Sequence, residues 1–214
     1  MIPMEVLALF FPVCVLLALT PGPDNIFVLT QSAINGKLAG LLVVLGLCTG
    51  VLVHTTAVAL GVAAIFQASD LAFNALKILG ACYLLYLAWG ALRAKPEEIA
   101  ITGPDGSAAK HIGYGKLYRR GIIMNVTNPK VSIFFLSFLP QFTDPSVGNM
   151  SWQMIQLGGF FILSTILIFG GIALLAGTIG TKLKKSPQAQ SYMNKAAGVV
   201  FIALAVKLAT ISQG

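Results

Sequence analysis

Charged residues are scarce in this sequence. Lys, Arg, Asp and Glu make up 10% of its 214 residues, whereas hydrophobic residues make up 57%. An ordinary soluble domain has about 25% charged residues. A soluble fold of this length could not cover its surface with 14 basic and 7 acidic residues while hiding so many apolar side chains. Because lipid is itself an apolar solvent, the composition predicts an integral membrane protein.

Acidic residues, cysteines and histidines are also few, and their scarcity argues against several functions. The chain has 7 acidic residues, 3 cysteines and 2 histidines. A transition-metal transporter needs several His, Cys or carboxylate side chains to converge on the metal. A hydrolase or phosphoryl-transfer enzyme needs a nucleophile with a base, or clustered carboxylates and histidines. A Gly-rich nucleotide-binding loop with its Lys is missing, which excludes a self-contained ATP-driven pump. We therefore predict no metal site and no cofactor.

The net charge of +7 does not indicate a nucleic-acid partner. Basic residues that bind phosphate backbones form patches interleaved with aromatic residues. Here they lie between long apolar runs, where positive charge sets the orientation of a membrane protein.

Six segments are apolar enough, over the roughly 20 residues that a helix needs, to cross a bilayer. They lie near 5–33, 38–66, 71–92, 118–140, 152–179 and 194–211. Most basic residues fall in the connections after the first, third and fifth segments, which are cytoplasmic by the positive-inside rule. Both termini are then predicted to be periplasmic.

A hydrophilic stretch at 93–117 divides these segments into two groups of three. Its turn-forming residues and mixed charges predict a cytoplasmic linker between the halves 1–92 and 118–214. Because three is odd, the second half enters the membrane from the opposite face. The predicted fold is an all-α membrane protein with six transmembrane helices in two inverted-topology halves, a common transporter design.

The first segment is interrupted by a run of helix breakers, Thr20-Pro21-Gly22-Pro23-Asp24-Asn25. Proline lacks an N–H and frees the carbonyl four residues earlier, here those of Leu17 and Leu19. We predict that Asp24 or Asn25 caps a second half-helix at about 26–34. Its first amides could then hold a carboxylate.

The first segment of the second half is broken in the same way, at Asn125-Val126-Thr127-Asn128-Pro129-Lys130. Pro129 frees the carbonyl of Asn125. Asn125 and Asn128 are three residues apart and share a helix face. Broken helices at matching places in two halves predict a transport site near the bilayer midplane.

Three titratable residues lie deep in these segments. An Asp at the bilayer centre costs about 2.5–3.5 kcal/mol, so we predict that Asp24 binds a proton or the ammonium group of the substrate. Lys130 is predicted to pair with Asp24 or to meet a substrate carboxylate, and His54 to relay protons. The structural alternatives are that Asp24 and Lys130 reach an interface, as Lys does by snorkelling, or that they form a purely structural pair. For His54 the alternative is a hydrogen-bonded packing residue.

The second segment contains a GxxxG pattern, Gly46 to Gly50. Such a pattern lets helices approach closely. We favour packing within the chain, and a homodimer interface is the alternative.

These motifs resemble those of the LysE/RhtB amino-acid exporter family. Besides the two proline runs and Gly46, Gly50 and His54, the resemblance rests on Leu76-Lys77, on Gly80-Ala81-Cys82-Tyr83-Leu84-Leu85-Tyr86-Leu87 and on Phe138-Leu139-Pro140-Gln141-Phe142. It implies a six-span exporter of the bacterial inner membrane, driven by the proton gradient through alternating access. Family substrates include lysine, arginine, homoserine, threonine and leucine, and the chain looks closer to the homoserine, threonine and leucine branch.

The resemblance also carries a transport role onto Asp24, Asn128 and Pro129. The alternatives to an amino-acid exporter are a transporter of another small solute or ion, and a membrane-embedded enzyme.

Overall fold

The computed structural model describes residues 2–20, 22–62, 70–94, 112–184 and 187–210. Within these ranges the regular secondary structure is entirely helical, as predicted. The elements are α1 (Met4–Leu19), α2 (Pro23–Asn35), α3 (Lys37–Ala57), the π-helix η1 (Val58–Val62), α5 (Asp70–Arg93), α6 (Tyr114–Thr127), α7 (Pro129–Ile133), the π-helix η2 (Phe134–Phe138), the 3-10 helix η3 (Leu139–Phe142), α8 (Met150–Lys184) and α9 (Pro187–Thr210).

The helices follow the predicted segments closely. The stretch 63–66 of the second predicted segment and most of the predicted linker lie outside the described residues. Where the chain resumes, α6 begins at Tyr114, inside the predicted linker.

Two helical stretches, Lys37–Gly61 and Met150–Ala176, are long and apolar enough to cross a membrane on their own. Two bent pairs of helices also qualify. The pair α1 and α2 bends by 62°, and the pair Tyr114–Thr127 and Pro129–Phe142 bends by 51°. If each bent pair is one span, the described part of the chain holds up to four spans. This supports a multi-pass membrane protein, and the six-span architecture stays a prediction.

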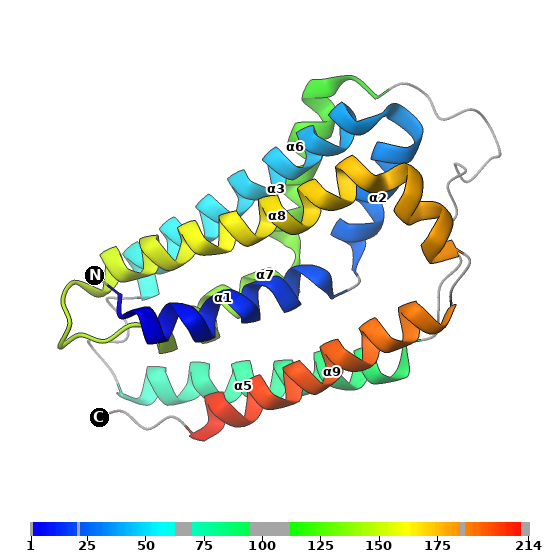
Figure 1. The fold of residues 1–214 in the computed structure, drawn as a ribbon. Helices are drawn as coiled ribbons and strands as arrows, with labels where there is room; N and C mark the ends of the chain where they lie inside the picture. The colour runs from blue at the N-terminus through cyan, green and yellow to red at the C-terminus, as the bar shows by residue number, and fades with distance from the viewer. Residues whose placement is uncertain (1, 21, 63–69, 95–111, 185–186, 211–214) are drawn as a thin grey trace.

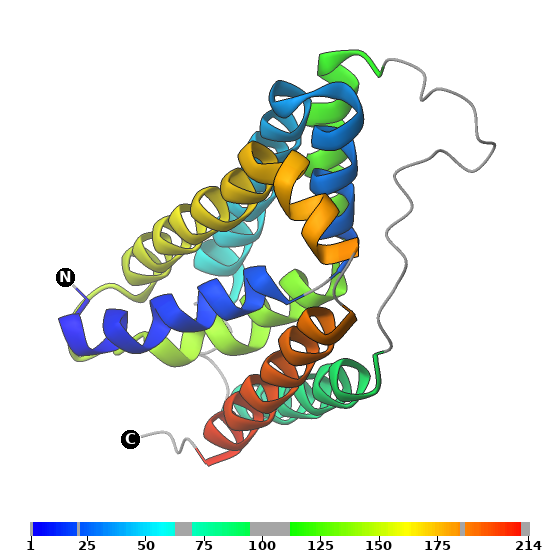
Figure 2. The same ribbon diagram turned by 45° about the vertical axis from the view of Figure 1, so that its right-hand side comes forward.

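The helices are arranged in two groups joined by α1 and α7 (Figures 1 and 2). One group contains α2, α3, α6 and α8, in which α3 packs against both α6 and α8. The other is the pair α5 and α9, which pack along each other. The two proline-containing breaks are the turn between α1 and α2 and the turn between α6 and α7. The two interrupted spans meet there, inside the bundle.

The basic ends of the helices gather at one end of the bundle, to the right in Figure 1. The start of α3 at Lys37 lies there, as do the end of α5 at Arg93 and the start of α6. The start of α1 and the end of α9 lie at the opposite end. These basic helix ends therefore lie opposite the start of α1 and the end of α9, although α9 itself carries Lys207 in its last turn.

The GxxxG pattern packs α3 against α6 of the same chain. A Cβ atom on Gly46 would collide with the Tyr118 carbonyl oxygen, and one on Gly121 would collide with the carbonyl of Val43. One on Gly50 would lie 2.6 Å from Asn125 side-chain atoms. Packing within the chain, which the sequence favoured, accounts for both glycines of the pattern.

Gly46→Ala is expected to destabilise the protein, because the added methyl group meets rigid backbone. Overpacking of this kind costs about 1–3 kcal/mol, which corresponds to a fall of roughly 2–12 °C in Tm. Thermal unfolding in detergent measures the effect. Gly170→Ala is the matched control, since a Cβ atom there meets nothing within 4 Å and alanine is the better helix former. Equal shifts in Tm for the two variants would contradict the packing argument.

Candidate functional site

The first break has a different local structure from the one predicted. The sequence predicted that Asp24 or Asn25 caps a helix beginning near residue 26, and this is wrong. Helix α2 begins at Pro23, with Gly22 as its N-cap and without a side-chain cap. Proline is favoured at the first helical position because its missing N–H would have no partner there. Pro21, also a predicted site residue, lies outside the described residues.

The second break repeats this pattern with a side-chain cap. Helix α7 begins at Pro129, and Asn128 is its N-cap. The Asn128 Oδ1 atom accepts a hydrogen bond from the Lys130 backbone N–H at 3.0 Å. Both interrupted spans therefore resume with a proline directly after a non-helical residue, while Pro23 and Pro129 themselves are exposed.

A hydrogen bond joins the two breaks. Asn128 Nδ2 donates to Asp24 Oδ2 at 2.8 Å, across 104 positions of sequence. Both side chains are buried, with exposed fractions of 4% for Asp24 and 9% for Asn128. The second carboxylate oxygen, Asp24 Oδ1, is buried and accepts no hydrogen bond within the described structure. An unpaired buried carboxylate oxygen is costly and can accept a proton or a donor from a solute.

Lys130 belongs to the second break, and its side chain donates hydrogen bonds to backbone carbonyls at the first. Its Nζ donates to the carbonyl oxygens of Leu17 and Thr20, each at 3.2 Å. The Leu17 carbonyl is one of the two that the proline run was predicted to free. The predicted alternatives for Lys130 were a pair with Asp24 or a substrate carboxylate. In this structure its ammonium group binds freed carbonyls, while the residue lines the same cavity as Asp24.

The carbonyl of Asn125, predicted to be freed by Pro129, is also occupied. It accepts from the Asn128 backbone N–H at 3.1 Å and is hydrogen-bonded to His54 Nε2 at 3.2 Å. The His54 ring stacks on Phe135 with a centroid distance of 5.5 Å. His54 thus contacts the second break from α3, although it is not among the residues lining the cavity.

The Asn25 side chain makes a hydrogen bond within the first break and does not line the cavity. Its Nδ2 donates to the Ala18 carbonyl at 2.8 Å, which ties the start of α2 back to the end of α1. This side chain is absent from the cavity lining.

A cavity lies between the two breaks and α8. It is lined by Leu17, Ala18, Asp24, Asn125, Lys130, Val131, Phe161, Thr165 and Phe169. Its volume is about 20 Å³, which is room for a water molecule and not for an amino acid. The polar lining residues Asp24, Asn125 and Lys130 come from the broken spans. The α8 residues of the lining were missed from the sequence, because α8 is apolar on every side and its periodicity marks no single face.

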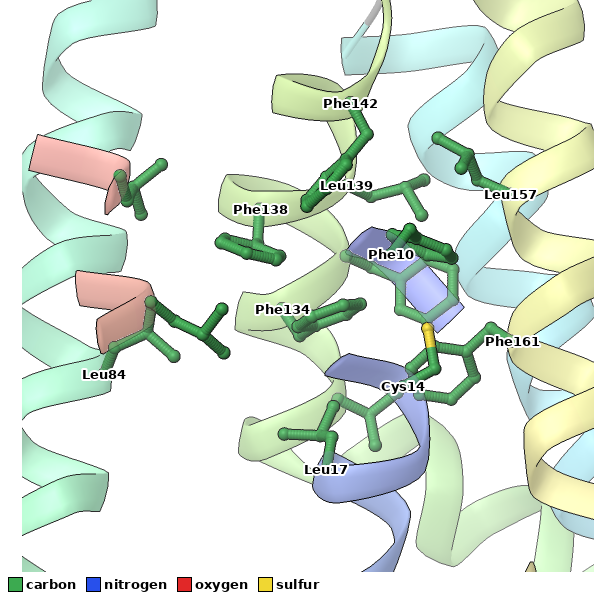
Figure 3. Packing of buried hydrophobic residues seen from close by; sticks show 14 of the residues in the cluster. Phe10, Cys14, Leu17, Leu84, Phe134, Phe138, Leu139, Phe142, Leu157 and Phe161 are labelled. Atoms are coloured by element: carbon green, nitrogen blue, oxygen red, sulfur yellow. The ribbon is translucent and has the colours of Figure 1, made fainter. Parts of the chain in front are cut away.

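Phenylalanine side chains of α1, η2, η3 and α8 pack together (Figure 3), and one of them, Phe161, also lines the cavity. The ring of Phe10 lies 5.1 Å from that of Phe142, and Phe134 lies 5.1 Å from Phe138 and 5.4 Å from Phe161. Phe10 precedes the cavity residues of α1, and the η2 and η3 rings follow those of α7. The aromatic cluster therefore lies between the cavity and the end of the bundle where α1 starts.

The chain is similar to known bacterial membrane proteins over most of its length. The LysE type translocator family matches residues 15–212. The chain is 30% identical over 206 residues to proteins named leucine efflux protein from Salmonella typhimurium and Salmonella choleraesuis, covering 93% of this chain and 92% of each relative. It is 29% identical over 196 residues to an uncharacterized membrane protein of Pseudomonas aeruginosa, covering 92% of this chain and 91% of that protein. No solved structure matches.

The family match covers most of the chain, including both proline-containing breaks and all the residues that line the cavity. The resemblance seen in the motifs is thereby confirmed. This chain belongs to the LysE type translocator family and is a membrane transporter rather than an enzyme.

Proposed function

We propose that this chain exports amino acids across the bacterial inner membrane by proton-coupled alternating access, with Asp24 at the centre of the transport site. The observation that carries the proposal is the hydrogen bond from Asn128 to Asp24. It joins the interrupted spans of the two halves at a buried carboxylate. Sites of this kind, built from discontinuous helices at the repeat interface, are typical of secondary transporters.

The proposed architecture is six spans in two inverted halves, 1–92 and 118–214, joined by a cytoplasmic linker at 93–117. The packing supports it, since equivalent helices of the two halves pair with each other, α3 with α8 and α5 with α9. The first helix of each half also packs on the middle helix of the other, α1 on α8 and α6 on α3. With the basic helix ends in the cytoplasm, both termini are periplasmic.

The chemistry of the site suits a zwitterion. Asp24 supplies an anion for an ammonium group, and Lys130 supplies a cation for a carboxylate. When a substrate is bound, its ammonium group takes the place of a proton on Asp24. When the carrier returns empty, a proton takes the place of the ammonium group on Asp24, where one carboxylate oxygen otherwise accepts no hydrogen bond within the described structure. Competition of proton and substrate for one carboxylate produces antiport.

The present cavity has room for a water molecule only, so we interpret the structure as a closed state. Loading an amino acid requires the broken spans to separate. The breaks at Gly22 and Asn128 are the natural hinges, because a few residues at element ends absorb such changes.

The relatives' name favours leucine or a similar neutral amino acid as the substrate. They are called leucine efflux proteins, and they align with nearly the whole chain. We propose a neutral, apolar amino acid as the preferred cargo.

Counterflow in proteoliposomes tests the proposal. Vesicles containing the purified protein are loaded with unlabelled leucine, threonine or lysine, and entry of the same labelled amino acid is followed. Leucine is expected to give the largest accumulation. Net efflux of preloaded leucine is expected to be faster when the medium is more acidic than the vesicle interior. Lack of counterflow with every amino acid would overturn the export proposal, and efflux that ignores the pH gradient would remove proton coupling.

A further inference from the structure

Three residues of α8, none of them singled out by the sequence, line the cavity as one stripe. Phe161, Thr165 and Phe169 are spaced by four and so share a helix face. All three are buried, with exposed fractions of 4%, 2% and 6%. They complete a cavity whose charged groups, Asp24 and Lys130, come from the broken spans.

The stripe presents no free hydrogen-bond donor to the cavity. Thr165 is the one residue in it with a hydroxyl group, and its Oγ1 donates to the Phe161 carbonyl in the same helix at 2.9 Å. The remaining lining residues that carry no polar side chain are Leu17, Ala18 and Val131. The cavity is therefore divided into a charged part, made by the two breaks, and an apolar part, in which α8 contributes the two largest side chains.

This division matches the two parts of an amino acid. We propose that the α8 stripe of Phe161, Thr165 and Phe169 determines specificity by contacting the substrate side chain, with Thr165 setting its permitted size. The proposal rests on the export function proposed above. The ammonium and carboxylate groups, common to all amino acids, bind at Asp24 and Lys130. A polar side chain against the stripe would lose its hydrogen bonds to water without gaining others, a penalty of about 1–3 kcal/mol.

Thr165 is the position of the stripe best placed to set size. Phe161 is held by the aromatic cluster, with ring centroids 5.4 Å from Phe134 and 5.1 Å from Phe135. Phe169 belongs to a separate cluster of buried hydrophobic residues that also contains Val43 and Leu47. The two rings are thus fixed by their neighbours, and the smaller side chain between them defines the space that remains.

Competition in the leucine counterflow assay tests this inference. Unlabelled methionine, phenylalanine and threonine compete with labelled leucine in vesicles containing wild type or a Thr165 variant. Thr165→Ala is expected to shift the phenylalanine-to-leucine preference about 10-fold or more toward phenylalanine, as one or two carbons do in an apolar pocket. Thr165→Leu is expected to shift it the other way. Thr165→Val is expected to leave it unchanged, because the hydroxyl bonds its own helix.

Ile166→Ala is the control on the same helix, since Ile166 is 47% exposed and lies outside the cavity lining. Its preference should equal that of wild type. If Thr165→Leu does not fold, the alanine and valine variants carry the test. Unchanged preferences in an active Thr165→Ala variant would overturn the specificity role and leave the export function standing. Wild-type protein without any amino-acid counterflow would instead overturn the export function itself.

Discussion

Asp24→Asn is expected to abolish proton-driven export while the protein remains folded in the membrane. Asparagine has the same size as aspartate and its Oδ1 can still accept the hydrogen bond from Asn128, but it carries no charge and no exchangeable acidic proton. Loss of a desolvated charge contact costs about 3 kcal/mol or more, which is a reduction of at least about 100-fold. Leucine efflux driven by a pH gradient measures the loss, and the amount of protein in purified membranes reports folding.

The same variant separates the two roles predicted for Asp24. If the carboxylate carries only the proton, leucine counterflow, which needs no net proton movement, survives in Asp24→Asn. If it binds the ammonium group, counterflow is lost as well. Wild-type efflux by this variant would remove Asp24 from the mechanism altogether.

Asp144→Asn is the matched control for the same chemical change outside the spans. Asp144 is exposed in the connection between η3 and α8, where its Oδ1 accepts hydrogen bonds from the Ser146 hydroxyl and backbone N–H. These bonds stabilise the charged form and lower the pKa of Asp144 below its usual value. Efflux by Asp144→Asn should equal that of wild type, so a similar loss in both variants would point to a general effect of removing acidic groups.

Lys130→Met is expected to lose both transport and stability. The ammonium group of Lys130 is the donor to two carbonyls at the first break, those of Leu17 and Thr20. Each carbonyl left unsatisfied in apolar surroundings costs about 1–3 kcal/mol, and the charge of Asp24 loses its neighbouring cation. Tm in detergent is therefore expected to fall sharply, with little leucine counterflow remaining. Lys130→Arg keeps the charge and several donors, so it should recover most of the stability.

Combining the two changes tests whether the charges act as a pair. In Asp24→Asn with Lys130→Met, the buried charge left behind by the single lysine replacement is gone. The double variant is expected to have a higher Tm than Lys130→Met and still to show no proton-driven efflux. A Tm for Lys130→Met equal to that of wild type would show that the carbonyls at the break do not need this lysine.

Much of the site could be recognised from the sequence because proline chemistry is local. A proline removes the same N–H and frees the same carbonyl in any fold. For that reason the carbonyls of Leu17 and Asn125 could be named in advance, and both accept side-chain hydrogen bonds in the structure. The predicted cap at Asp24 or Asn25 was wrong because two adjacent preferences compete, and proline at the first helical position prevailed over a side-chain cap.

The α8 wall could not be recognised from the sequence. An amphipathic helix in water marks its buried face by its apolar residues. In a membrane the outer face is apolar too, so Ile166, which is exposed, and Phe161, which is buried, look alike in the sequence. The apolar half of the cavity emerges only when α8 is packed against both broken spans.

The membrane environment, the approximate extent of the helices and the positions of the two breaks could be predicted from the sequence. These features depend on composition and on covalent chemistry within a few residues. Which groups bind the freed carbonyls at the breaks is apparent only from the packing of the helices. Lys130 reaches the Leu17 carbonyl across 113 positions of sequence, and Asn128 reaches Asp24 across 104. Contacts over such separations depend on how helices pack, and a carbonyl freed inside an apolar bundle binds whichever donor that packing brings to it.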